Sequence, residues 1–152
     1  MKTLDKVWLA AIIDGEGCLS ISHFQKTQQS GYLDKTRTCT SEAFVTSLSI
    51  CNCSKPLIDK VVEITKTDTK ITEVRRKNHA TLYRWKVSSN KDILEILDAV
   101  DKYLIAKHEQ AQVMREFINK RMEGKGRYTE EQREKLIELA DELSILNHFE
   151  RN

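Results

Sequence analysis

The sequence lacks the large excess of basic residues that many nucleic-acid-binding proteins carry. Its 25 lysines and arginines are nearly balanced by 23 aspartates and glutamates, for a formal net charge of +2. Net charge therefore does not by itself indicate a nucleic-acid partner. The charges are unevenly distributed, because residues 125–152 are rich in glutamate whereas residues 70–86 contain six basic residues and the single acid Glu73. We therefore expect a local basic surface, whose positive charge is offset in the net charge by the acidic end of the chain.

The sequence also lacks a zinc-site cysteine pattern and any apolar run long enough to cross a membrane. Its four cysteines form no Cys-x-x-Cys pair and no zinc-type spacing with histidine, so we expect free thiols in a reducing compartment. No stretch approaches the ~18 apolar residues of a membrane span. Met1–Lys6 leads directly into a helix without a small-residue cleavage site, so no secretory signal is expected. These absences predict a soluble intracellular protein with no membrane partner.

Hydrophobic periodicity predicts a single α+β domain over residues 1–152. Helices are expected at residues 3–13, 56–65, 90–100, 106–122 and 129–146, and strands at 18–24, 44–52, 71–77 and 82–88. Gly15 and Gly17 are expected to end the first helix, and the polar stretch 25–42 is interpreted as an extended hairpin tip. Strand pairs alternating with helices predict an antiparallel sheet with helices on one face and an open polar face on the other.

The first predicted helix is apolar on every side. Val7–Ile13 contains no polar side chain except the indole of Trp8, whereas a surface helix has one apolar stripe. One side can pack on the domain's own sheet, so we expect the other side to pack on a second copy of the chain, which two adjacent alanines would let approach closely. The expected contacts at this dimer interface are Trp8, Ala10, Ala11 and Ile12. The alternative is an ordinary central core helix.

Two carboxylates follow this helix, in the segment Asp14-Gly15-Glu16-Gly17. Acids near a helix C-terminus oppose the helix dipole. A bound cation would offset that cost, and hard divalent cations prefer carboxylate oxygens. Asp14, Gly15 and Glu16 are therefore a candidate metal site, although the aspartate can instead cap a neighbouring element.

Leu9–Gly17 resembles the nine-residue signature of the LAGLIDADG homing endonucleases. The positions that match outright are Leu9, Ala10, Ile13, Asp14 and Gly17, and the other four keep size or charge class. The expected element order also resembles the family's αββαββα core, which would cover residues 4–120 and leave a helical C-terminal extension at about 127–148. The resemblance implies a metal-dependent endonuclease that hydrolyses phosphodiesters of double-stranded DNA at a long pseudo-palindromic site, with Mg²⁺ or Mn²⁺. A single copy of the signature implies a homodimer.

The resemblance also implies three catalytic residues. Glu16 occupies the position of the acid that binds metal at the centre of the site. Asn52 resembles the residue that orients water near the metal, although an asparagine between a strand and a helix can be a simple turn or cap residue. Lys107 belongs to a Lys-x-x-Gln-Ala segment and matches a lysine that stabilises phosphate charge. Asp14 is expected to be mainly structural.

DNA contacts are expected from the open face of the sheet, because a two-stranded ribbon fits the major groove. Strand alternation, together with the basic residues of the hairpins, nominates Ser20, Ser22, Phe24, Lys26, Arg37, Ser47, Ser49, Glu73, Arg75, Lys77, Arg84 and Lys86. A slip of one residue in the third strand would replace Arg75 by Arg76. The alternative for exposed basic residues on strands is solubility and edge protection.

Two other functions remain open from the sequence. An RNA-splicing maturase or a non-cleaving DNA-binding regulator could use the same fold, but neither needs an acid at a phosphate site, so Glu16 together with Asn52 and Lys107 favours cleavage. An interaction protein unrelated to nucleic acids would explain the apolar helix, but would leave the basic strand residues without a purpose.

Overall fold

The computed structural model describes residues 1–30, 37–75, 79–124 and 128–149, with the side chains of 25–30, 37–41 and 149 left outside the description. In chain order, the elements are α1 (Thr3–Glu16), β1 (Gly17–Ser30), β2 (Arg37–Asn52), α2 (Lys55–Thr65), β3 (Thr72–Val74), β4 (Leu82–Val87), α3 (Asn90–Val100), a 3₁₀ turn η1 (Asp101–Tyr103), α4 (His108–Glu123) and α5 (Glu130–Phe149). The predicted mixed α+β architecture is confirmed.

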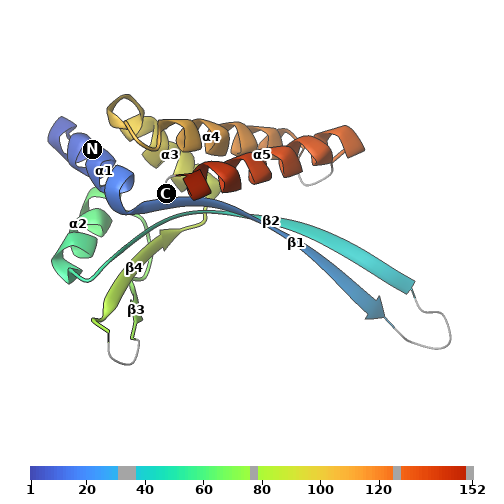
Figure 1. Cartoon of the computed structure of the whole chain (residues 1–152), viewed down its shortest axis with the longest axis horizontal. Coiled ribbons are helices and arrows are strands. Elements are labelled where there is room, and N and C mark those ends of the chain that lie inside the picture. The colour runs from blue at the N-terminus through green and yellow to red at the C-terminus, as the bar shows by residue number, and fades with distance from the viewer. Residues whose placement is uncertain (31–36, 76–78, 125–127, 150–152) are drawn as a thin grey trace.

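The strands form one antiparallel sheet in the order β1-β2-β4-β3. Helices α3, α4 and α5 lie over one face of this sheet, and β1 and β2 continue beyond them as a long twisted ribbon (Figure 1). The extended hairpin predicted over residues 25–42 is mostly paired strand, because pairing continues from Gly17 opposite Ile50 to Ser30 opposite Arg37. Threonine and other polar residues fill these strand positions, where apolar alternation fades.

The glycines led us to expect that the first helix ends at Ile13. Instead, it continues through Glu16. Gly15 lies inside the last turn, and Gly17 is the C-cap whose N–H donates to the Ile13 carbonyl. A Cβ on Gly17 would lie 2.5 Å from that carbonyl oxygen. The glycine therefore permits the immediate turn from α1 into β1, and Glu16 belongs to the helix rather than to a loop beyond it.

One hydrophobic core joins the sheet to all the α-helices. Leu9, Ile13, Trp85 and Phe117 are fully buried within it. The C-terminal helix contributes as well, through the buried side chains Leu136, Leu139 and Leu143. No helix in the described ranges is long and apolar enough to cross a membrane.

Candidate catalytic centre and nucleic-acid interface

Asp14 attaches the last turn of α1 to the start of α4. Its Oδ2 accepts a hydrogen bond from the main-chain N–H of Ile105 at 2.8 Å, and its Oδ1 accepts one from the main-chain N–H of Lys107 at 2.9 Å. Lys107 is the N-cap residue of α4, so this carboxylate lies at the positive end of that helix. Asp14 therefore caps a neighbouring element, the start of α4, which is the alternative that the sequence left open. Both carboxylate oxygens are thereby engaged, which favours the structural role of Asp14 over its nomination as a metal ligand.

Lys107 brings a positive charge to the end of α1. The residue is only 8% exposed, and its Nζ donates to the main-chain oxygen of Asp14 at 3.0 Å. A cation beside the last carbonyls of a helix is electrostatically favourable. Lys107 thus contacts α1 at Asp14, which precedes Glu16 by two residues.

Glu16 differs from Asp14 in being exposed and unengaged. Within the described part of the chain, its carboxylate makes no hydrogen bond or ion pair, and a Cβ built on the adjacent Gly15 would meet nothing within 4 Å. Its oxygens suit a hard divalent cation. However, no group of three or more histidine, cysteine or acidic side chains among the described residues could hold a metal ion. The carboxylate of Glu16 suits a cation, but the described residues of one chain do not complete the coordination of that cation.

Asn52 is the last residue of β2 and lies at the same end of the sheet as Glu16, since Gly17 pairs with Ile50. Its Oδ1 accepts a hydrogen bond from the main-chain N–H of Ser54 at 2.8 Å, directly before α2. The turn role, which the sequence left open, is thus present. It uses the amide oxygen of Asn52.

The open face of β1 and β2 contains the alternating residues that the sequence placed there. Ser22 pairs with Val45 and lies beside Phe24, which is 49% exposed. Ser47 is an exception. It is only 5% exposed, and its Oγ is hydrogen-bonded to Ser20 Oγ at 2.9 Å. The expectation that Ser47 is available for contact is therefore wrong, because its short side chain is buried and bonded to Ser20.

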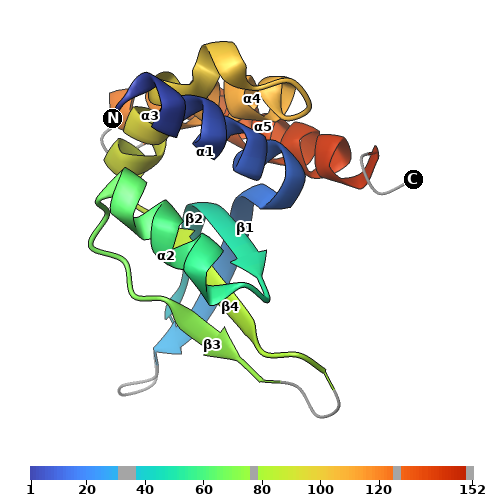
Figure 2. The ribbon, with the colours of Figure 1, turned by 90° about the vertical axis from the view of Figure 1, so that its left-hand side faces the viewer.

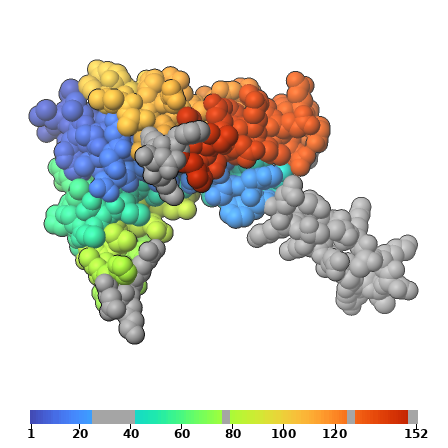
Figure 3. Space-filling model, in the orientation of Figure 1, coloured from blue at the N-terminus to red at the C-terminus, as the bar shows by residue number. Residues whose placement is uncertain are grey.

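On the second hairpin, Arg84 and Lys86 of β4 are exposed on the open face that also includes the half-buried Ser49. Ser49 pairs directly with Lys86. Arg84 Nε also donates to Cys51 Sγ at 3.2 Å. The lower side of the molecule is hollowed between this hairpin and β1 (Figure 3), so the sheet presents a concave surface with basic groups on its β4 side.

The predicted register of the third strand is wrong by one residue. Thr72 pairs with Arg84, and Glu73 pairs with Tyr83. Directly paired residues share a sheet face, so Glu73 lies on the face opposite Arg84. Arg75 follows β3 and forms an ion pair with Glu73 at 3.0 Å, so neither residue lies where we expected.

Three other nominated positions have no described side chain. Lys77, like the alternative residue Arg76, lies outside the described residues. Lys26 and Arg37 lie in the paired ribbon, but their side chains are outside the description.

The outer side of α1 is apolar and exposed, but it includes only one of the two adjacent alanines. Ala10 is 1% exposed and packs in the chain's own core, so its assignment to a dimer interface is wrong. Ala11 is exposed, and the half-buried Trp8 and Ile12 flank it. Leu4 and Val7, which are 82% and 44% exposed, also lie on this side and were not predicted. The available signal was the spacing of three residues from Leu4 to Val7 and four from Val7 to Ala11, which places all three on one side of a helix. The helix lies on the side of the molecule that faces the viewer in Figure 2.

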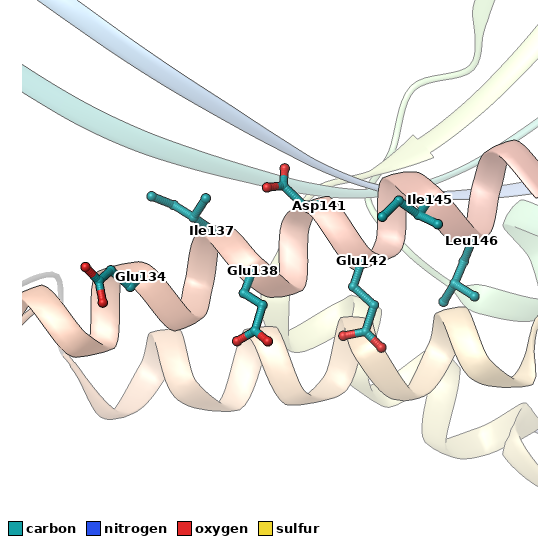
Figure 4. A pocket seen from close by; sticks show the side chains of 7 residues that line it. All are labelled: Glu134, Ile137, Glu138, Asp141, Glu142, Ile145 and Leu146. Atoms are coloured by element: carbon teal, nitrogen blue, oxygen red, sulfur yellow. The ribbon is translucent and has the colours of Figure 1, made fainter.

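A hollow of about 610 Å³ lies elsewhere, along one side of α5 (Figure 4). Its lining consists of four acids and three apolar residues: Glu134, Ile137, Glu138, Asp141, Glu142, Ile145 and Leu146. The acidic lining opposes phosphate binding, and the hollow includes none of the nominated catalytic residues.

Residues 9–117 match the family model described as LAGLIDADG endonuclease. The chain therefore belongs to the LAGLIDADG endonuclease family. No curated protein matches the sequence.

Solved homing endonucleases have the same fold. The homing endonuclease I-CvuI, in complex with the I-CreI target, is 20% identical with a TM-score of 0.69, over 94% of this chain and 82% of that chain. The archaeal intron-encoded homing endonuclease I-Vdi141I, complexed with DNA, is 18% identical with a TM-score of 0.72, over 94% and 84%. I-GzeII, in complex with its DNA target, is 20% identical with a TM-score of 0.65, over 89% of this chain but only 43% of that chain.

Proposed function

We propose that this protein is a site-specific double-strand DNA endonuclease that acts as a homodimer with a divalent metal, Mg²⁺ or Mn²⁺. The observation that carries the proposal is the free carboxylate of Glu16, at the end of a helix whose outer side is apolar and exposed. Family membership supports nuclease activity. The DNA complexes of I-CvuI, I-Vdi141I and I-GzeII support duplex DNA as the substrate.

The dimer follows from the same helix. Leu4, Val7 and Ala11 form an exposed apolar stripe on α1, and burying such a stripe favours association. Open space beside Gly15 permits close approach at the C-terminal end of the helix. A second copy packed on this stripe would bring a second Glu16 to the first, which supplies the acid that one chain lacks. The match to less than half of the I-GzeII chain is consistent with two copies doing what one longer chain does.

The two Glu16 carboxylates would hold the metal. A divalent cation bound there supplies Lewis acidity, which activates water and neutralises charge on the scissile phosphate. The chain's own contribution is geometric and electrostatic. Asp14 fixes the last turn of α1 against α4 through its two main-chain hydrogen bonds. Lys107, held on the Asp14 carbonyl, places a positive charge beside the site where phosphate charge accumulates.

Duplex DNA would lie against the concave face of the sheet. Arg84 and Lys86 are suited to phosphates or guanine edges, and Ser22 and Ser49 to weaker polar contacts. Phe24 and Val45 add apolar contact area on the ribbon. If Arg84 contacts a phosphate, Arg84→Gln should weaken binding about equally across sequences and reduce the salt-dependence slope by about one.

A cleavage selection tests this function. The wild-type protein is incubated with a randomised DNA library in Mg²⁺ or in EDTA, and cut molecules are sequenced. We expect one long, pseudo-palindromic site to be cut only with the metal. Selective binding without cutting would instead favour a regulator or maturase on this fold. Absence of any DNA binding would contradict the nucleic-acid function itself.

A further inference from the structure

The β1–β2 ribbon leaves the helical layer at a cluster of aromatic side chains. His23 of β1 stacks on Phe44 of β2, with ring centroids 4.6 Å apart and planes inclined by 13°. Phe44 in turn packs edge-on against Phe117 of α4 at 5.5 Å. Both phenylalanines are buried. The base of the ribbon is therefore fixed against the body of the domain at His23 and Phe44.

Two residues before Phe44 on β2, Glu42 makes a polar link to α5. One of its carboxylate oxygens contacts His23 Nε2, and the other accepts a hydrogen bond from Arg133 Nε at 2.7 Å. Arg133 Nη1 also bonds Glu130 Oε1 at 2.7 Å. Burial alone would raise the pKa of Glu42, but hydrogen bonds and charges from Arg133 and His23 outweigh it and hold that pKa below its usual value. The link is thus an ionised pair at neutral pH, and it joins β1, β2 and α5.

The C-terminal helix contacts the ribbon at a second point, on its other strand. Asn147 Nδ2 donates to the main-chain oxygen of Leu19 at 2.8 Å, on β1, which is an edge strand of the sheet. The helix runs along the near part of the ribbon (Figure 1). It lies beyond residues 9–117, which match the family model. The C-terminal helix therefore supports the ribbon at Leu19 and again at Glu42.

We propose that Arg133 is a positioning residue for DNA recognition: its ion pair with Glu42 fixes the direction in which the β1–β2 ribbon leaves the body. The proposal rests on the proposed DNA binding, because it concerns the outer base pairs that the ribbon would reach. Because the ribbon is long, a small rotation at its base displaces its far end by a large distance. Five strand residues from Glu42 to Arg37 span roughly 17 Å, so a rotation of about 10° at the base moves Arg37 by about 3 Å. A shift of that size separates a formed hydrogen bond from a lost one.

The test compares binding to two targets in Ca²⁺. One is the full site found by cleavage selection, and the other has its outer base pairs scrambled. We expect Arg133→Gln to reduce the preference for the full site by roughly two- to fivefold, as for a partly exposed ion pair, and to leave affinity for the scrambled site unchanged. Exchanging the charges, with Arg133→Glu and Glu42→Arg together, should restore much of the preference. Lys135→Gln is the matched control, because in the described structure Lys135 forms its ion pair with Glu138 on its own helix.

A merely structural role predicts different results. If Arg133→Gln weakens binding to both targets equally, or lowers only the unfolding midpoint, the proposal is overturned. Hydrogen exchange of the DNA-free protein separates this failure from failure of the proposed function. Arg133→Gln should accelerate amide exchange in residues 17–30 and 37–52 but not in α2. Unchanged exchange overturns the positioning role whatever the DNA result. Accelerated exchange in a protein that binds no DNA overturns the proposed function, and with it any role of Arg133 in DNA recognition.

Discussion

Replacing Asp14 by asparagine should destabilise the fold, whereas replacing Glu16 by glutamine should not. Asp14 accepts two main-chain hydrogen bonds, at 2.8 and 2.9 Å, from residues more than 90 positions away. An asparagine keeps one acceptor oxygen, loses the charge and turns an NH₂ group toward the second N–H donor. A hydrogen bond to a charged acceptor contributes about 1.5–3 kcal/mol and a neutral one about 1 kcal/mol. Losing one bond and weakening the other should therefore lower the free energy of unfolding by about 2–4 kcal/mol.

The assay is urea unfolding in EDTA, at one fixed protein concentration because association itself contributes to stability. In a chain of this length, the same change should lower Tm by roughly 4–16 °C. Glu16→Gln is the matched control, since its exposed carboxylate has no partner in the described structure, and it should stay within about 0.5 kcal/mol of wild type. An Asp14→Asn variant as stable as wild type would refute the structural role of this carboxylate and reopen its assignment as a metal ligand.

Three further outcomes are expected. The folded-state pKa of Glu42 is lowered, so its contribution to stability is present above the pKa of an unfolded glutamate and disappears as pH falls through the folded value. The loss of stability between about pH 6 and pH 3 should therefore be shallower for Glu42→Gln than for wild type. An unchanged acid profile would contradict this. Val7→Glu should give a single-chain mass in sedimentation at low micromolar concentration. Ile145→Glu, at an exposed apolar position on α5, should have the same mass as wild type. A wild-type protein that is monomeric with and without DNA would contradict the proposed dimer. Gly17→Ala should cost about 1–3 kcal/mol in urea unfolding, because the new Cβ overlaps the preceding turn, and an unaffected midpoint would show that this turn can relax.

The elements were predictable from the sequence wherever apolar spacing was strong. All five helices and four strands exist close to their expected positions. The boundaries failed where composition misled. Gly15 was interpreted as a stop, but a helix tolerates glycine in its last turn. Residues 25–42 were interpreted as a tip because polar residues give no alternation, although the pairing of β1 with β2 holds many of them in strands.

Side-chain roles were less predictable, because they depend on contacts between distant residues. Ala10 and Ala11 are chemically identical, and only the packing of α1 decides which of them is buried. In the third strand, Thr72-Glu73-Val74-Arg75 alternates acceptably in either register, and its pairing with β4 selects the one not expected. The contacts of Asp14 with Lys107, and of Glu42 with Arg133, span more than 90 residues. No local pattern indicates them, although the family resemblance had singled out Lys107.

The proposed nuclease activity depends most directly on Glu16, the acid that would hold the metal. Single-turnover cleavage of the selected target should be measured in Mg²⁺ for wild type, Glu16→Gln and Glu95→Gln, an exposed glutamate of α3, with DNA affinity measured in parallel. We expect Glu16→Gln to bind the target as wild type does but to cut at least about 100-fold more slowly, since a bound metal contributes several kcal/mol to catalysis. Glu95→Gln should cut normally. A Glu16→Gln variant that cuts at the wild-type rate would contradict the account.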